Sequence, residues 1–354
     1  MTAHPTVEQN GRMELVNRTP VPAACAIADG WDEEHQAGVV TAKATFTYEP
    51  GEALALDTQS PLPLFDDDEP TRYGVIPRDD LPREGDDFEV IFLGCAHAQR
   101  VRAVDAMEVE LSVGPAARRL AVFGDRRWTD AGPSAPQPFR AMPLTWQNAF
   151  GGACVALVDR EAPVIVTEAR NPAGKGFDPW PQALALAEYL RCPPGYPSLD
   201  ASLELPNVES PGALIRRRED APAPASWATL PLSSVAHALR MIDVSRTQSE
   251  GRPALTEQRF HRAVPEWVIA RPEEGAEVVL RGLDPSGEVR FSLPRLRVLA
   301  DFDVGGARTT VALSPQTMVL LGEKRTVTVT YRAHVHLRRV DELEKSVRLR
   351  VERE

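Results

Sequence analysis

The sequence predicts a mainly β protein, in which antiparallel sheets form β-sandwich-like or barrel-like domains with a few short helices. Two observations support this fold class. Thirty-two prolines and 23 glycines are spread through the 354 residues and interrupt the chain too often for long helices. Between these breaks, apolar and polar residues alternate with a period of two, the pattern of strands with one buried face.

The first half of the chain contains four segments with this alternation. They are residues 39–48, 88–94, 107–113 and 118–124. The sequence Gly-Pro-Ala-Ala between the last two predicts a turn, and connections this short exclude a parallel crossover. We therefore expect an antiparallel meander.

A second strand-rich block begins near Glu277. Its expected strands are residues 277–283, 288–294, 295–302, 309–314, 317–321 and 325–337. The sequence Asp-Pro-Ser-Gly at 284–287 has proline where φ is already fixed and glycine where the chain must reverse. It predicts a hairpin between the first two strands of the block.

Between the two blocks, residues 180–192 and 232–244 have apolar residues at three- and four-residue spacing, which predicts short helices. Residues 216–231 are rich in charge, proline and alanine, which is typical of a linker. We therefore expect three parts: an N-terminal β-rich domain (1–215), a linker with a short helix (216–256) and a C-terminal antiparallel β domain (257–354). The alternative is one fold with a long internal loop.

Charge and composition limit the partners. The net charge of -11 repels nucleic-acid phosphates, and the one dense basic run, Arg216 to Arg218, is followed at once by Glu219 and Asp220. No apolar run approaches the roughly 18 residues of a membrane span, and the first residues lack a signal-peptide pattern. We expect a cytoplasmic protein with reduced cysteines that binds neither nucleic acid nor membranes.

Two glycine-containing segments, MPLTWQNAFGG (142–152) and NPAGKGF (171–177), raise the question of a phosphate site. A P-loop needs a glycine five residues before its Gly-Lys pair and Ser or Thr directly after it. Those positions hold Ala169 and Gly176, so the segment is not a P-loop. The sequence also lacks GxGxxG, GxSxG, HExxH and an EF-hand loop. These absences favour a binding protein over an enzyme, and we expect no cofactor.

Metal ligands are sparse as well. His334 and His336 occupy alternate positions of an expected strand, so their imidazoles share a face, but no third ligand can be identified. The four carboxylates at 66–69 lack the alternate spacing of a calcium loop and are better explained as a solvated turn. We expect no metal site, and no catalytic pair of carboxylates can be selected without geometry.

Arg126, Arg127 and Trp128 come directly after an expected strand. A guanidinium stacked on an indole can anchor a protein partner. The alternative is that arginine pairs with a carboxylate at the strand end while tryptophan fills the core. Both interpretations stay open from the sequence.

In the segment 171–177, the residue before proline is held extended, and Gly174 and Gly176 permit positive φ. The segment therefore predicts a tight loop with Lys175 as a polar contact at its tip.

Four uncommon motifs occur in order along the chain. They are VFGDRRW (122–128), PFRAMPLTWQNAFGG (138–152), NPAGKGF (171–177) and LPNVESP (205–211). Together with LVNRTPVPA and VVTAKATFTY near the start and TVTVTYRAHVHL near the end, they resemble a bacterial family known as domain-of-unknown-function family 2169. The resemblance covers nearly the whole chain.

This resemblance implies an accessory protein of the type VI secretion system. Such adaptors or chaperones are thought to hold a toxin effector with a PAAR-like N-terminal domain and to help load it onto the VgrG spike in the cytoplasm. They are not regarded as enzymes. Antiparallel sheets have edges that accept another strand, and PAAR-like tips are β-rich, so edge pairing is an expected mode of contact.

The motif residues are candidates either for binding this partner or for bracing the surface that does. They are Arg127, Trp128, Pro143, Trp146, Phe150, Gly151, Gly152, Asn171, Pro172, Gly174, Lys175, Gly176, Phe177, Pro206 and Asn207. We expect their loops to lie near one another, with core positions as the alternative for Trp146 and Phe150.

Two other functions remain open from the sequence. A carbohydrate-active β-sandwich hydrolase would require a deep pocket with two inward carboxylates about 5 to 9 Å apart. A structural component of the spike or baseplate would be found in secreted spike material.

Overall fold

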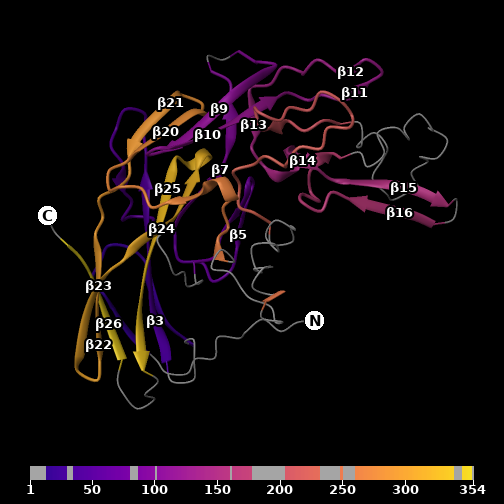
Figure 1. Ribbon diagram of the computed structural model, residues 1–354. Coiled ribbons are helices and arrows are strands. Elements are labelled where there is room, and N and C mark those ends of the chain that lie inside the picture. Colours follow the sequence, from indigo (N-terminus) through magenta and orange to yellow (C-terminus); the bar gives the residue numbers. More distant parts are fainter. Residues whose placement is uncertain are drawn as a thin grey trace.

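The computed structural model has the mainly β architecture that the sequence predicts (Figure 1). It describes residues 13–29, 35–79, 87–99, 102–159, 162–177, 204–231, 248–249, 260–338 and 345–352. The helical elements with defined bounds in these ranges are 3-10 turns: η1 (Trp146–Asn148), η5 (Pro265–Trp267) and η6 (Gly322–Lys324). The helices expected at 180–192 and 232–244 lie outside the described residues. No helix within the described ranges is long and apolar enough to cross a membrane.

The largest sheet has seven strands. In spatial order they are β19 (Val268–Ala270), β7 (Asp87–Leu93), β24 (Ser314–Leu321), β25 (Thr326–Arg338), β3 (His35–Thr47) and β2 (Ala23–Asp29), with β4 (Ala55–Leu56) beside β3. β3 and β25 are antiparallel over 13 residues each. Because side chains alternate along a strand, one face carries Val327 and Val329 and the other carries Thr328 and Thr330. All four side chains are buried, so other parts of the protein cover both faces of the large sheet at this level.

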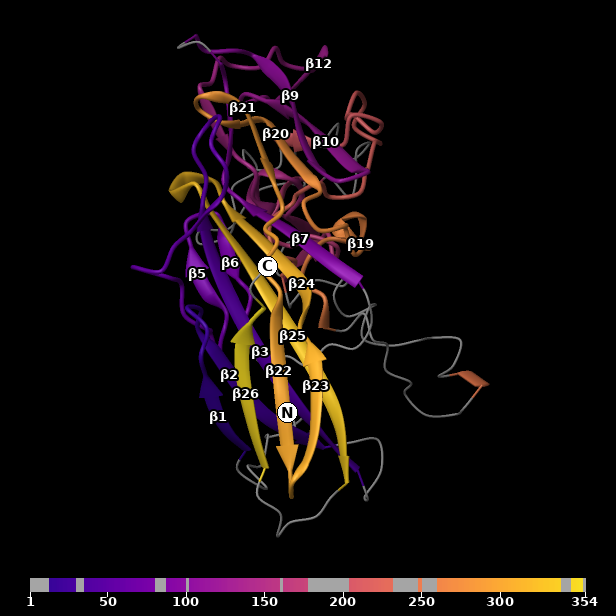
Figure 2. The same cartoon turned by 90° about the vertical axis from the view of Figure 1, so that its left-hand side faces the viewer.

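A four-stranded sheet covers the apolar face at one end of the large sheet. Its order is β1 (Met13–Asn17), β26 (Lys345–Val351), β22 (Val298–Val304) and β23 (Ala307–Ala312). These strands lie over β3 and β25 in Figure 2 and beside them in Figure 1, as in a β-sandwich. Phe302 and Val347 belong to the same buried cluster as Val40 of β3.

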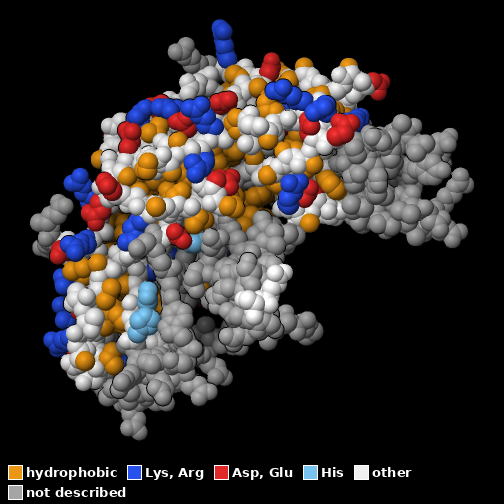
Figure 3. Space-filling view, in the orientation of Figure 1, with side chains coloured by type: hydrophobic (Ala, Val, Ile, Leu, Met, Phe, Trp, Pro, Cys, Tyr) orange, Lys and Arg blue, Asp and Glu red, His pale blue; other side chains and the backbone are white. Residues whose placement is uncertain are grey.

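A five-stranded sheet lies at the other end. Its order is β18 (Val208–Glu209), β10 (Ala116–Phe123), β9 (Ala106–Val113), β20 (Glu277–Asp284) and β21 (Gly287–Ser292). Opposite charges alternate across its outer surface: Glu110 pairs with Arg119 and Arg281, and Arg281 pairs with Glu288. Figure 3 shows the mixture of basic and acidic side chains over this part of the molecule. Such exposed pairs contribute little stability but keep the face polar.

The remaining described strands form short pairs. These are β5 (Glu69–Thr71) with β6 (Gly74–Ile76), β8 (Cys95–His97) with β13 (Ala141–Pro143), β11 (Trp128–Thr129) with β12 (Gly132–Pro133), β14 (Phe150–Gly151) with β17 (Lys175–Gly176), and β15 (Ala153–Asp159) with β16 (Ala162–Thr167). None of the sheets formed by the described residues closes into a barrel.

The two hairpins expected from turn sequences are confirmed, as β9–β10 and β20–β21. The meander is wrong beyond β9–β10, because β7 lies parallel to β24 and β3 lies between β2 and β25. Alternation identifies a strand with a buried face, but it does not identify the neighbouring strand.

The expected domains 1–215 and 257–354 contribute strands to the same sheets. β3 pairs with β25, β7 with β24, and β9 with β20. The expected linker also contains core residues: Trp227 is fully buried, and its carbonyl accepts a hydrogen bond from Phe92 N–H at 2.9 Å. Proline and alanine in 216–231 indicate irregular backbone, which here lies partly inside the protein.

Candidate functional site

The four sequence motifs meet at one place. We call this group the motif cluster and define it as residues 122–128, 142–152, 171–177 and 204–211. β14 runs parallel to β17, which joins the second segment to the third. Isolated β-bridges between backbones join Ala149 to Val208 and Arg127 to Glu204. They connect the first and fourth segments to the other two. The cluster lies at the base of the β15–β16 hairpin, which projects from the large sheets in Figure 1.

Asn171 holds the second and third segments together. Its side chain is buried, and its Nδ2 donates to the carbonyl oxygens of Trp146 at 2.7 Å and Phe150 at 3.0 Å. Its own carbonyl oxygen accepts a hydrogen bond from Gly152 N–H at 2.9 Å. Buried carbonyl groups need such partners, so this one amide fixes the path of the facing loop.

Glycine is required where the segments approach most closely. At Gly152, where φ is +100°, a Cβ atom would lie 2.5 Å from the carbonyl oxygen of Gly174. At Gly176, where φ is +91°, it would lie 2.7 Å from Cδ of Pro206. Gly174 differs from expectation, because its φ is not in the left-handed region. Glycine is needed at this position because there is no room for a side chain: a Cβ atom would lie 2.6 Å from the carbonyl oxygen of Ala149.

The cluster has a small hydrophobic core of its own. It consists of Trp128, Phe150, Leu205 and Ile215, with Phe177 packed against it. The rings of Phe150 and Phe177 meet edge to face at 6.4 Å. Trp146 instead belongs to the main core, and its Nε1 donates to the carbonyl oxygen of Thr229 at 2.9 Å. Trp146 and Phe150 thus occupy core positions.

A buried ion pair links the first and fourth motifs. The guanidinium of Arg126 lies 3.8 Å from the ring centre of Phe123, donates to the carbonyl oxygen of Pro206 at 2.7 Å, and pairs with Glu209. The other oxygen of Glu209 accepts Ile215 N–H at 2.8 Å. Burial raises the pKa of Glu209, and the charge of Arg126 partly opposes this rise. Breaking such a pair by removing one partner is costly, because the other charge stays buried.

From the sequence, Arg126 was one of two arginines that could pair with a carboxylate at the strand end, but Glu209 was not identified as the partner. Arg126 is buried and its neighbour Arg127 is exposed. Alternation along the strand distinguishes the two arginines. The period-two burial of Leu120 and Val122 in β10 continues beyond the strand through residues 124, 126 and 128, which places Arg126 on the buried side. No comparable pattern marks Glu209.

Two asparagines complete the joints between segments. Nδ2 of Asn207 donates to the carbonyl oxygen of Phe123 and to Asp125 Oδ1, both at 3.1 Å, and its N–H donates to the carbonyl oxygen of Asn148 at 2.8 Å. Nδ2 of Asn148 donates to the carbonyl oxygen of Pro143 at 2.9 Å. Side-chain amides therefore satisfy backbone groups where no regular sheet does so.

Most of the candidate residues are inside the cluster. The buried ones are Trp128, Trp146, Phe150, Gly151, Gly152, Asn171, Gly176, Pro206 and Asn207. Pro143, Gly174, Lys175 and Phe177 are half-buried, and Arg127 and Pro172 are exposed. Lys175 Nζ lies 3.9 Å from Glu204 Oε2, and the backbone of Arg127 forms an isolated β-bridge with Glu204. We call Arg127, Pro172, Lys175 and Phe177 the outer patch.

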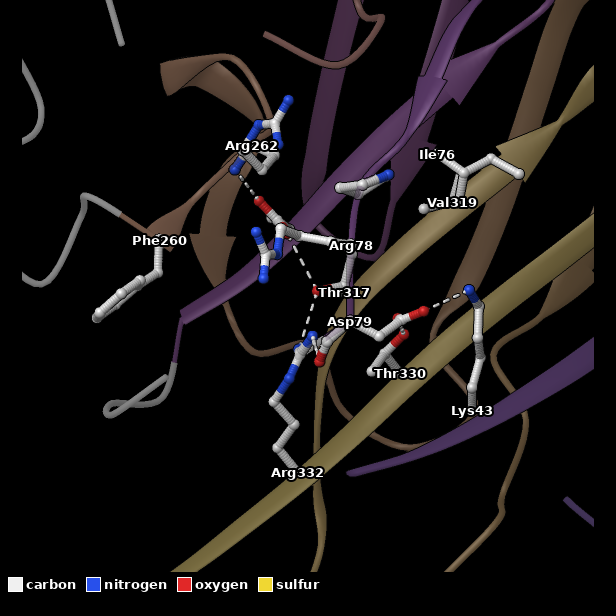
Figure 4. Close-up of a pocket in the computed structure, with 12 residues that line it drawn as sticks. Lys43, Ile76, Arg78, Asp79, Phe260, Arg262, Thr317, Val319, Thr330 and Arg332 are labelled. Carbon is white, nitrogen blue, oxygen red and sulfur yellow. Dashed lines mark hydrogen bonds and ion pairs between the residues drawn. The ribbon is translucent and has the colours of Figure 1, made fainter. Parts of the chain in front are cut away.

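A second polar group lies on the large sheet (Figure 4). Lys43 Nζ is 2.7 Å from Asp79 Oδ2, and Thr330 donates to Asp79 Oδ1 at 2.9 Å. Glu89 accepts the N–H of Arg262 at 2.7 Å. Burial lowers the pKa of Lys43, and the charge of Asp79 opposes this effect.

The two buried carboxylates of this group bear on the hydrolase alternative. The cavity that Asp79 and Glu89 line has a volume of about 10 Å³, roughly the space that one water molecule needs. A sugar ring does not fit there, so this pair is not the cleft that a glycosidase requires.

The two histidines singled out from the sequence lie together on β25. The ring centres of His334 and His336 are 5.6 Å apart. Within the described ranges, no group of three or more His, Cys, Asp or Glu side chains has a metal-binding arrangement. In the acidic run 66–69, the carboxylate of Asp68 accepts hydrogen bonds from both terminal nitrogens of Arg262, at 2.8 Å each. Asp68 therefore has a structural partner.

Fold and site together define a multi-sheet β protein in which glycine and asparagine loops form a braced cluster at the base of a projecting hairpin. The chain belongs to the family described as uncharacterized protein conserved in bacteria (DUF2169), whose model matches residues 33–332. That match includes the whole motif cluster. No curated protein and no solved structure matches the chain.

Proposed function

We propose that the protein is an adaptor or chaperone of the type VI secretion system. It binds a toxin effector through the effector's PAAR-like N-terminal domain and assists loading onto the VgrG spike, in the cytoplasm and by binding rather than catalysis. The proposal begins from the motif resemblance described above.

The observation that carries the proposal is the convergence of all four motifs into one braced cluster. Buried polar joints, such as Asn171 to Phe150 and Arg126 to Glu209, hold irregular loops in one arrangement. Rigidly supported loops are where proteins commonly place their binding surfaces. A bracing core below an outer patch therefore fits a protein that presents a fixed surface to a partner.

Two residues of the outer patch, Arg127 and Phe177, are of types that are enriched at protein interfaces. Arginine is also frequent among the residues that dominate binding energy. Loss of conformational entropy on binding is small when the loops are already held in place. We expect the effector to contact this patch.

The direct test is co-expression with the PAAR-like toxin encoded beside this gene. The toxin is expected to co-purify with the wild-type chain, and deletion of the gene is expected to abolish toxin secretion. A toxin that is soluble, stable and secreted without this protein would refute the adaptor function.

A charge-reversal pair tests the outer patch. Arg127→Glu combined with Lys175→Glu is expected to weaken co-purification. The control is Arg308→Glu, at a side chain that is 84% exposed on the distant strand β23. Equal loss in both proteins would show that the outer patch has no special part in binding.

A further inference from the structure

An open groove lies beside the start of β10 and the short strand β19. Its volume is about 730 Å³, and its lining comes from residues 113–116, 118 and 269–276. Ligand-binding pockets commonly have volumes of roughly 300–1,000 Å³. Figure 2 shows β10 and β19 on the same side of the molecule.

Two sheet edges border this groove. Among the described residues, β19 pairs only with β7 and ends the seven-stranded sheet. Within the part of the chain that the structure describes, only Ala121 and Val122 of β10 pair with β18, so Ala116 to Leu120 form an open edge of the five-stranded sheet. In antiparallel pairs, alternate residues direct their N–H and C=O groups away from the neighbouring strand. An extended peptide is the ligand that such edges bind best.

The residues along one side and at the two ends of the groove limit where a peptide can lie. Ile269 is half-buried and Ala270 is exposed, so the β19 side is accessible and apolar. At one end, the guanidinium of Arg118 lies 5.9 Å from the ring centre of Trp267, just before β19. At the other end, Gly114 lies close to the loop that leads into β20, since a Cβ atom there would be 3.5 Å from Cβ of Ala276.

An apolar pocket adjoins the groove across the loop 271–274, which lines both. Its volume is about 190 Å³, enough for one large side chain, and Leu293, Leu296 and Leu313 contribute to its wall. Glu273 and Glu274 are exposed on the same loop, while Arg118 and Arg271 are half-buried in the wall of the groove. The groove therefore combines an open strand edge, a side-chain pocket and two adjacent exposed carboxylates.

We propose that this groove binds an extended segment of the effector, which adds as a strand to the edge of β19. A large apolar side chain of the segment enters the pocket, and a basic side chain lies against Glu273 and Glu274. In this binding mode, main-chain hydrogen bonds supply affinity and the pocket supplies specificity. The inference rests on the adaptor function proposed above.

Substitutions can test the groove without touching the motif cluster. Ala116, in the groove, and Phe123, in the cluster, are seven residues apart on β10, or about 24 Å at the usual rise of a strand. Ala270→Trp is expected to fill the groove and weaken effector binding by at least about tenfold, which corresponds to 1.4 kcal/mol. The control is Ala117→Trp, at an exposed alanine of β10 that does not line the groove.

A charge substitution covers the case in which Ala270→Trp does not fold. Glu273→Lys with Glu274→Lys changes only exposed side chains and is expected to weaken binding, most clearly at low salt. Glu108→Lys, at an exposed position on β9, is its control.

Hydrogen exchange of the wild-type complex separates the two proposals. We expect the amides of residues 268–276 and 113–118 to exchange more slowly in the complex than in the free chain. A complex without this protection overturns the groove and leaves the adaptor function standing. If no complex forms, both are overturned.

Discussion

Replacing Gly152 by alanine tests the close contact between the two glycine-containing loops. The added Cβ atom would lie 2.5 Å from the carbonyl oxygen of Gly174, whose own N–H is held by the carbonyl of Asn171 at 3.2 Å. A backbone oxygen cannot rotate away as the end of a side chain can. The two loops must therefore separate, or the residue must remain strained.

Gly132→Ala provides a matched control. Gly132 has φ of +109°, close to the +100° of Gly152, but no atom lies within 4 Å of its added Cβ. The unfavourable φ alone costs about 1–3 kcal/mol at either site. Overpacking adds about 1–3 kcal/mol, and only at Gly152.

The assay is urea unfolding of both variants, monitored by tryptophan fluorescence. Gly152→Ala is expected to lower the free energy of unfolding by about 2–6 kcal/mol, against about 1–3 for Gly132→Ala. Equal losses in the two variants would refute the contact between the loops.

Two further predictions concern buried polar groups. Asn171→Ala removes the donor to the buried carbonyl of Phe150 and should lower the free energy of unfolding by about 1–3 kcal/mol, whereas exposed Gln147→Ala should change it by less than about 0.5 kcal/mol; equal melting temperatures would contradict this. For Asp68, burial raises the pKa, but the hydrogen bonds and positive charges of Arg262 and Arg78 together lower it by more, for a net decrease. Its contribution to stability is therefore complete above the ordinary aspartate pKa of about 3.9 and is lost as pH falls through the lower value in the folded state. In urea titrations from pH 7 to pH 2, the stability gap between wild type and Asp68→Asn should shrink; a constant gap would show that Asp68 makes no such contribution.

The strands and the two hairpins could be predicted from the sequence because their signals are local. Alternation reports a buried face, and Asp-Pro-Ser-Gly reports a reversal at 284–287. The strand neighbours could not be predicted, since β3 pairs with β25 about 290 residues later, and the choice of neighbour depends on side-chain packing across the whole fold.

The candidate site was predicted in outline but not in detail. The two glycine-containing loops do meet, and Lys175 makes a polar contact with Glu204, but it does so from the short strand β17 and not from a loop tip. The sequence did not reveal that Asn171 is the joint between them, because its partners are backbone carbonyls whose positions depend on the fold. It also did not reveal the groove beside β19, which forms from segments about 150 residues apart.

The most direct test of the adaptor function is a titration of the purified chain with the purified PAAR-like domain of the neighbouring toxin. Isothermal titration calorimetry measures the affinity, and size-exclusion chromatography with light scattering measures the mass of the complex. We expect a stable complex with a Kd below about 1 μM, or about -8 kcal/mol. Two separate peaks and no heat of binding at tenfold higher concentration would contradict it.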